Sequence, residues 1–153
     1  MQRYLNTLIR MLTIFLLLGS LPAAAVERPF SLQGAGTVTF TDGNPPTGGE
    51  VTASGTATHL GQWTQVGVLS FTYNPDSPLI QAGGSEFFMA ANGDKLYYQI
   101  HGELDPVTGI ATGTFLFVGG TGRFEGASGS ADTVLQQDPS GPFEVTAVGT
   151  IDY

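Results

Sequence analysis

Residues 118–131 read VGGTGRFEGASGSA, and this stretch decides the fold predicted for the chain. Glycine fills five of its fourteen positions, with one basic and one acidic residue in the middle. A glycine loop that binds phosphate leads into a helix whose N-terminal amides hold the anion. Here more glycines and then alternating polar and apolar residues follow, and neither GxxxxGK[ST] nor GxGxxG spacing occurs. The stretch therefore indicates a sharp corner between two strands.

The glycines of this stretch allow the backbone conformations that a corner needs. Glycine adopts positive φ and lets a second backbone approach closely. Phe124 is expected to point inward, while its neighbours Arg123 and Glu125 face outward. The residues to which a fold-forming role is assigned are Gly119, Gly120, Gly122, Phe124, Gly126 and Gly129.

Beyond this corner, the chain after residue 25 alternates polar and apolar residues and shows no helical period. Such alternation between clusters of Gly, Pro, Asn and Asp is typical of short strands joined by turns. Strands are expected at 30–41, 50–59, 63–73, 85–91, 94–104, 110–118, 128–137 and 143–152. Eight antiparallel strands with one apolar face predict an all-β closed barrel, with a two-sheet β-sandwich as the alternative.

Residues 1–25 have the layout of a secretory signal peptide. Two arginines precede a short apolar run at 11–18, and three consecutive alanines end the segment at Ala25. The run is shorter than the roughly 20 apolar residues of a membrane-spanning helix. The prediction is cleavage after Ala25 and export to the periplasm or the medium. One domain at 26–153 would remain, without membrane attachment.

The predicted mature domain is strongly acidic and has no cysteine. Three basic residues stand against thirteen acidic ones, which gives a formal net charge of −10. Such a surface repels phosphate backbones, so no nucleic-acid partner is expected. An exported chain without cysteine folds without disulfides, so burial of apolar side chains has to stabilise it.

The segment at 117–137, FVGGTGRFEGASGSADTVLQQ, resembles the late-strand segment of allene oxide cyclase-like barrels. There a GG[ST]G-x-FEG-x-SG pattern joins two strands, and dirigent proteins carry a related GGTG-x-F-x-x-A-x-G segment. A second stretch, ATHLGQWT at 57–64, resembles a segment of exported bacterial proteins that share the GGTGRF motif. The resemblance implies an allene oxide cyclase-like or dirigent-like barrel of an exported bacterial branch.

A barrel of this kind implies a lumen for a small hydrophobic molecule and, as often in the plant relatives, a trimer. Cyclases and dirigent proteins of this fold act mainly by holding a reactive substrate in one conformation. The groups with catalytic roles in those families lie on earlier strands, and none matches a residue of this chain.

Three functions follow from the predicted barrel. The first is an exported soluble barrel that binds a small apolar molecule or has a structural role. The second is a cyclase or isomerase of the same fold, and the sequence leaves open whether the protein is an enzyme. The third is a small outer-membrane barrel, which needs a uniformly apolar outward face on every strand. The strand expected at 50–59 offers only small apolar residues and one valine.

Three side chains are candidates for acid–base chemistry: His59, His101 and Glu103. His59 ends the apolar face of the strand at 50–59, near one rim. His101 and Glu103 share one face of the strand at 94–104, where a carboxylate can orient and charge an imidazole, although a solvated polar face is the alternative. Two scattered histidines without cysteine do not suit zinc, and no EF-hand spacing occurs, so neither metal nor cofactor is predicted.

Two pairs of adjacent aromatic residues flank the expected hairpin turn at Asn92-Gly93. They are Phe87-Phe88 and Tyr97-Tyr98. Successive residues of a strand face opposite ways, so one member of each pair faces outward. An exposed aromatic face predicts a subunit interface, in a dimer or trimer, or a ligand site.

Overall fold

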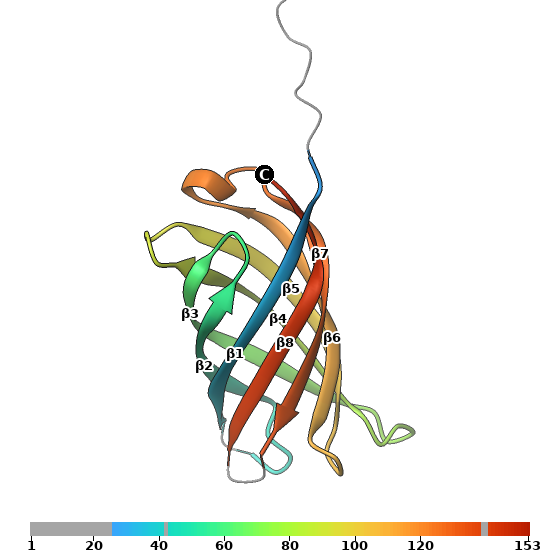
Figure 1. Cartoon of the computed structure of the whole chain (residues 1–153). Helices are drawn as coiled ribbons and strands as arrows, with labels where there is room; N and C mark the ends of the chain where they lie inside the picture. The colour runs from blue at the N-terminus through green and yellow to red at the C-terminus, as the bar shows by residue number, and fades with distance from the viewer. Residues whose placement is uncertain (1–25, 42, 139–140) are drawn as a thin grey trace, which may run out of the picture.

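The computed structural model describes residues 26–41, 43–138 and 141–153. They form a closed antiparallel barrel in which each strand pairs with the next and the last pairs with the first (Figure 1). The strands are β1 (Arg28–Phe40), β2 (Gly48–Ala57), β3 (Gly61–Tyr73), β4 (Ile80–Ala90), β5 (Lys95–Asp105), β6 (Ile110–Gly120), β7 (Ser128–Gln137) and β8 (Pro142–Asp152), with one 3₁₀ turn, η1 (Gly122–Phe124). The predicted eight-stranded barrel is confirmed, and the two-sheet sandwich is not the fold. The proposed signal peptide lies outside the described residues.

The largest difference from the expected strands is the start of β4. This strand begins at Ile80 instead of Ser85, because Gly83 pairs with Ser70 of β3 and with His101 of β5. Glycine weakens a strand by itself. Here it allows close packing, since a Cβ at Gly84 would lie 2.9 Å from the carbonyl oxygen of Val68.

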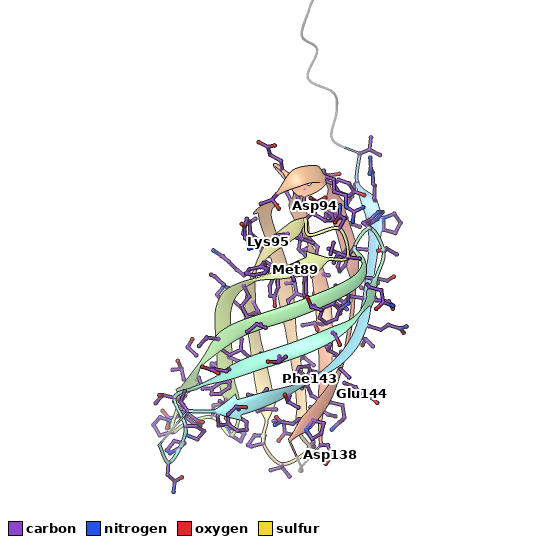
Figure 2. All side chains as sticks on the ribbon, turned by 90° about the vertical axis from the view of Figure 1, so that its left-hand side faces the viewer. Met89, Asp94, Lys95, Asp138, Phe143 and Glu144 are labelled. Carbon is purple, nitrogen blue, oxygen red and sulfur yellow. The ribbon has the colours of Figure 1, made fainter. Side chains whose placement is uncertain are left out.

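The two ends of the barrel differ in what forms them. We call the end with η1 and the turns at 58–60 and 91–94 the upper end, and the end with the loops at 43–47, 74–79 and 106–109 the lower end (Figure 1). Met89, Asp94 and Lys95 lie toward the upper end, and Asp138, Phe143 and Glu144 toward the lower end (Figure 2). The C-terminus lies at the upper end.

Inward-facing apolar side chains form one core. At the upper end, the fully buried side chains include Phe30, Leu60, Leu96, Phe124 and Ile151. In the middle of the barrel, Trp63, Phe88, Tyr98 and Phe115 pack edge-to-face or stacked on one another, with centroid separations of 4.3–5.4 Å. Aromatic packing of this kind adds about 0.5–1.5 kcal/mol per pair beyond area burial.

The outward face of the barrel is mostly polar. Exposed charged and amide side chains occur on seven of the strands, including Glu50, Gln62, Gln81, Glu103, Gln136 and Glu144. A lipid-facing barrel needs an apolar band on its outside, and this exterior gives the outer-membrane alternative no support.

None of the described residues forms a helix that is long and apolar enough to cross a membrane.

Candidate functional site

A cavity inside the barrel is the candidate site. It has a volume of about 100 Å³, and every one of the eight strands contributes lining residues. Most of the lining is apolar, with Leu69, Ala82, Ile100 and Leu135 below the aromatic layer. For comparison, an engineered apolar cavity of about 150 Å³ holds a benzene molecule. The lumen has about two thirds of that volume, which is of the same order of size, and it has room for a small molecule.

One carboxyl group lies inside this cavity. The Glu86 side chain belongs to β4, is only 7% exposed, and points inward in line with Phe88 and Ala90. Tyr98 lies directly opposite on β5, and its hydroxyl donates a hydrogen bond of 2.8 Å to Glu86 Oε2. The Gln65 amide on β3 donates a second hydrogen bond to the same oxygen. We call Gln65, Glu86 and Tyr98 the lumen triad.

A glycine makes room for the carboxyl group. A Cβ at Gly67 on β3 would lie 2.2 Å from Glu86 Cδ, so any larger residue there would displace the carboxyl group. Gly67 has an ordinary φ, and its role is therefore one of space. The strand sequence Gln65–Gly67 thus supplies both a hydrogen-bond donor and the gap for its acceptor.

The lumen shifts the pKa values of both ionisable members of the triad. Burial raises the pKa of Glu86 above its ordinary 4.5, and the hydrogen bonds from Tyr98 and Gln65 only partly oppose this. Burial, followed by the nearby Glu86 charge and its hydrogen bond, raises the pKa of Tyr98 well above its ordinary 10.0. Tyr98 therefore remains a proton donor to Glu86 at any physiological pH.

Two buried polar atoms at the cavity have no hydrogen-bond partner among the described residues. They are Glu86 Oε1 and the indole nitrogen of Trp63. Both residues line the cavity, and Trp63 is 2% exposed. A buried polar group without a partner costs about 1–3 kcal/mol. A ligand that bonded to these atoms would recover this free energy.

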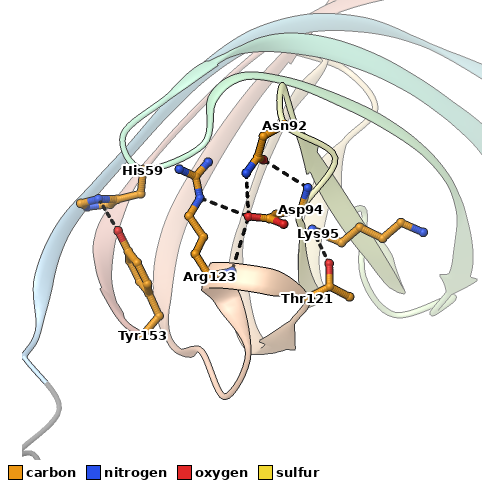
Figure 3. Close-up of polar contacts among 7 residues, drawn as sticks. All are labelled: His59, Asn92, Asp94, Lys95, Thr121, Arg123 and Tyr153. Atoms are coloured by element: carbon orange, nitrogen blue, oxygen red, sulfur yellow. Dashed lines mark hydrogen bonds and ion pairs between the residues drawn. The ribbon is translucent and has the colours of Figure 1, made fainter.

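The three predicted acid–base residues lie elsewhere. His59 follows β2 in the upper-end turn and has a φ of 67°. Its Nε2 lies 2.9 Å from the Pro29 carbonyl oxygen. Its Nδ1 lies 3.0 Å from the Tyr153 hydroxyl oxygen (Figure 3). His101 and Glu103 share a face, as expected, and both side chains are exposed on the outside of β5. Glu103 Oε1 accepts a hydrogen bond of 2.6 Å from Gln81 Nε2. The structure therefore does not bring these three residues together.

Sequence reasoning missed Glu86, although a signal was present. In the segment EFFMA, Glu86 alternates with Phe88 and Ala90, so the period-two pattern places a carboxyl group on the apolar face. The strand predicted at 85–91 already contains this alternation, and the structure shows that Glu86 faces the same way as Phe88 and Ala90.

The glycine stretch forms the upper-end corner. Gly119, Gly122 and Gly126 have φ values of 120°, 58° and 76°, which other residues rarely adopt. Gly120 has no room for a side chain, since a Cβ there would lie 2.2 Å from the Lys95 carbonyl oxygen and 2.5 Å from Phe124 Cβ. Phe124 is fully buried, so η1 closes the upper end of the barrel.

Asp94 ties this corner to the β4–β5 turn (Figure 3). Its Oδ2 accepts hydrogen bonds from Asn92 Nδ2 at 2.8 Å and from the Arg123 backbone N–H at 3.4 Å, and it lies 3.8 Å from Arg123 Nε. The Lys95 backbone N–H donates to Thr121 Oγ1 at 2.9 Å. These contacts are partly exposed and connect two turns that lie side by side.

The closed barrel and its corner define the class of fold. It is a closed antiparallel barrel of eight strands with a glycine-rich corner, as predicted. The resemblance of that corner to allene oxide cyclase-like and dirigent-like barrels, and the exported bacterial branch, stay predictions. No protein-family model matches the chain, and no curated protein matches it. A solved structure of the pterocarpan synthase dirigent protein GePTS1 is similar with a TM-score of 0.47 and 12% sequence identity, over 86% of this chain and 89% of that one.

Proposed function

We propose that the barrel is an exported protein that binds one small, largely apolar molecule in its lumen. The observation that carries this proposal is the cavity of about 100 Å³, whose walls come from all eight strands and are mainly apolar. A concave apolar site with a few polar groups is the usual form of a small-molecule site. The lumen triad supplies those polar groups.

Native mass spectrometry of the protein, purified without detergent, tests this proposal. The expected result is a small apolar adduct on the wild-type protein that Ala111→Leu removes, because Ala111 lines the cavity. Ala35→Leu is the matched control, since Ala35 is exposed on the outside of β1. An adduct that survives Ala111→Leu as well as Ala35→Leu would place binding outside the lumen, against the proposal.

A cyclase or isomerase activity is the second candidate, and Glu86 is the observation that favours it. Among the described residues, Glu86 and Tyr98 are the ionisable side chains of the buried core. A buried carboxyl group whose pKa is raised can act as a general acid or base. Turnover of a bound molecule that Glu86→Gln abolishes, with binding retained, would support this activity. Turnover unaffected by Glu86→Gln would exclude Glu86 from the chemistry.

A homo-oligomer is proposed from the outer apolar patch. This patch lies on the outward faces of β3 to β6 and consists of Val66, Val68, Phe87, Met89, Tyr97, Leu116 and Val118. Val66 is 68% exposed, and Phe87 and Tyr97 contact each other at a centroid separation of 6.1 Å. Contiguous exposed apolar residues mark interaction surfaces. The double variant Val66→Thr and Leu116→Thr is expected to be a monomer where the wild type is an oligomer, and light scattering measures both masses. A monomeric wild type would refute the proposal.

A further inference from the structure

The two unpartnered atoms at the cavity restrict the chemistry of a lumen ligand. Trp63 Nε1–H can only donate a hydrogen bond. Glu86 Oε2 already accepts from Tyr98 and Gln65, so Oε1 is the carboxyl oxygen left for a ligand. Oε1 accepts when the carboxyl group is ionised and donates when it carries the proton.

A hydroxyl group can bond to both atoms in either protonation state of Glu86. Its oxygen accepts from Trp63 Nε1–H, and its proton is donated to an ionised Glu86 Oε1. If Oε1 carries the proton, the hydroxyl oxygen accepts from it instead. A ketone accepts from Trp63, but it has no proton for an ionised carboxylate.

The charges of the lumen exclude anionic ligands. The basic side chains of the described residues are Arg28, Lys95 and Arg123, and none of them lines the cavity. Arg28 lies over the Tyr153 ring, and Lys95 lies over the ring of Phe87. A ligand carboxylate would therefore be buried beside Glu86 without a counter-charge, which is strongly unfavourable.

We propose that the lumen selects an uncharged alcohol, whose hydroxyl accepts a hydrogen bond from Trp63 Nε1 and pairs with Glu86 Oε1 while its hydrocarbon part fills the apolar cavity. This inference rests on the proposed lumen binding and adds the ligand class. The two side chains that bond to Glu86, Gln65 on β3 and Tyr98 on β5, carry no competing charge. Thr133 on β7, which lines the same cavity, is neutral as well. Glu103 touches the cavity lining, but its side chain is exposed and bonded to Gln81.

The single tryptophan of the chain provides a direct reporter. In a ¹⁵N-labelled sample its indole N–H gives one resonance, and titration of that resonance measures binding at the proposed site. The probes are cyclopentanol, cyclopentanone, cyclopentane and cyclopentanecarboxylate, which share one ring size. Above the pKa of Glu86, cyclopentanol is expected to bind roughly tenfold more tightly than the ketone, which lacks one of the two hydrogen bonds, since one buried hydrogen bond contributes about 1 kcal/mol. It should bind roughly a hundredfold more tightly than the hydrocarbon, which lacks both. The carboxylate is expected not to bind.

Two variants test the role of each atom. In Glu86→Gln, the amide can keep its oxygen toward Tyr98 and present its NH₂ group to the cavity. The preference for the alcohol over the ketone should then fall from roughly tenfold to about one, because both remaining groups are donors. In Trp63→Phe, the hydrogen bond to Glu86 remains, so the preference for the alcohol over cyclopentane should fall roughly tenfold, as measured by ligand-observed NMR. Thermal unfolding of both variants checks that the barrel is intact.

A pH titration of the wild-type protein covers the case in which Glu86→Gln does not fold. Burial holds the pKa of Glu86 above 4.5, so acidification to pH 4.5 protonates most of this carboxyl group in the folded protein. Affinity for cyclopentanone should rise as the pH falls through this pKa, while affinity for cyclopentanol changes little. Ketone affinity that stays constant across this range would overturn the assignment of Glu86 Oε1.

The possible outcomes separate this inference from lumen binding itself. Equal binding of cyclopentane and cyclopentanol would leave lumen binding intact and overturn the preference for alcohols. A preference for the alcohol that is undiminished in Trp63→Phe would place the hydroxyl elsewhere, and tight binding of the carboxylate would overturn the charge argument. If no probe shifts the indole resonance and water alone bonds to these atoms, both proposals fail.

Discussion

The upper and lower ends of the barrel are built from the same eight strands, yet their interiors differ. At the upper end, Phe124, Leu96 and Ile151 are fully buried and close the barrel. Toward the lower end, the inward positions carry smaller or partly buried residues such as Ala82 and Ala111, and the cavity lies among them. The choice between a packed core and a binding site therefore depends on side-chain volume at inward positions.

Removing the aromatic residue that closes the upper end should have the largest effect. Phe124→Ala is expected to lower the free energy of unfolding by about 3–5 kcal/mol, because it leaves a cavity in a packed region. Guanidinium unfolding measures the loss. Val107→Ala in a lower-end loop is the control, since Val107 is 89% exposed. Equal losses in the two variants would contradict the contrast between the ends.

Alanine substitutions at two adjacent glycines of the corner should destabilise the protein for different reasons. Gly120→Ala is expected to destabilise by about 1–3 kcal/mol, since its Cβ would collide with the Lys95 carbonyl oxygen and with Phe124. Gly119→Ala meets nothing within 4 Å and should cost only the backbone strain at a φ of 120°, about 1–3 kcal/mol. Thermal unfolding measures both variants, and a Gly120→Ala protein as stable as the wild type would refute the steric argument.

The lumen triad should give the protein a pH-dependent stability. The pKa of Glu86 is raised in the folded state, so folding takes up a proton when the pH lies between 4.5 and the folded pKa. The contribution of Glu86 is complete below 4.5 and is lost as the pH rises through the folded pKa. Unfolding free energies measured from acid to neutral pH should therefore decline in the wild type relative to Glu86→Gln.

Tyr98→Phe sharpens that measurement. The hydrogen bond from Tyr98 lowers the pKa of Glu86, so its removal should move the decline to higher pH. Phenylalanine keeps the stacking on Phe88, whose ring centroid lies 4.3 Å from that of Tyr98. A decline that does not move would show that Tyr98 does not bond to the carboxyl group in solution.

The smallest effect is expected from the ion pair at the upper end. Arg123 Nε lies 3.8 Å from Asp94 Oδ2, and both side chains are partly exposed. Exposed pairs contribute about 0–1 kcal/mol, so Arg123→Ala should change stability by less than the glycine variants do. A loss as large as that of Phe124→Ala would mean that charge, and not packing, closes this end.

The sequence made the barrel and its corner predictable because both depend on local signals. Alternation of polar and apolar residues predicted the strands, and the glycine motif predicted the turn around the buried Phe124. The site was less predictable. His101 and Glu103 were correctly placed on one face, but alternation alone does not say which face is inward when both carry polar residues.

The sequence by itself determined the fold class, the corner and the acidic charge of this protein, since each follows from residue type and short-range spacing. Tertiary structure alone decided the lumen triad. Gln65, Glu86 and Tyr98 come from three strands and meet only through the register of β3, β4 and β5. It also decided where the barrel is filled and where it is hollow. The position of the cavity depends on the volumes of inward side chains from all eight strands, so no single segment encodes it.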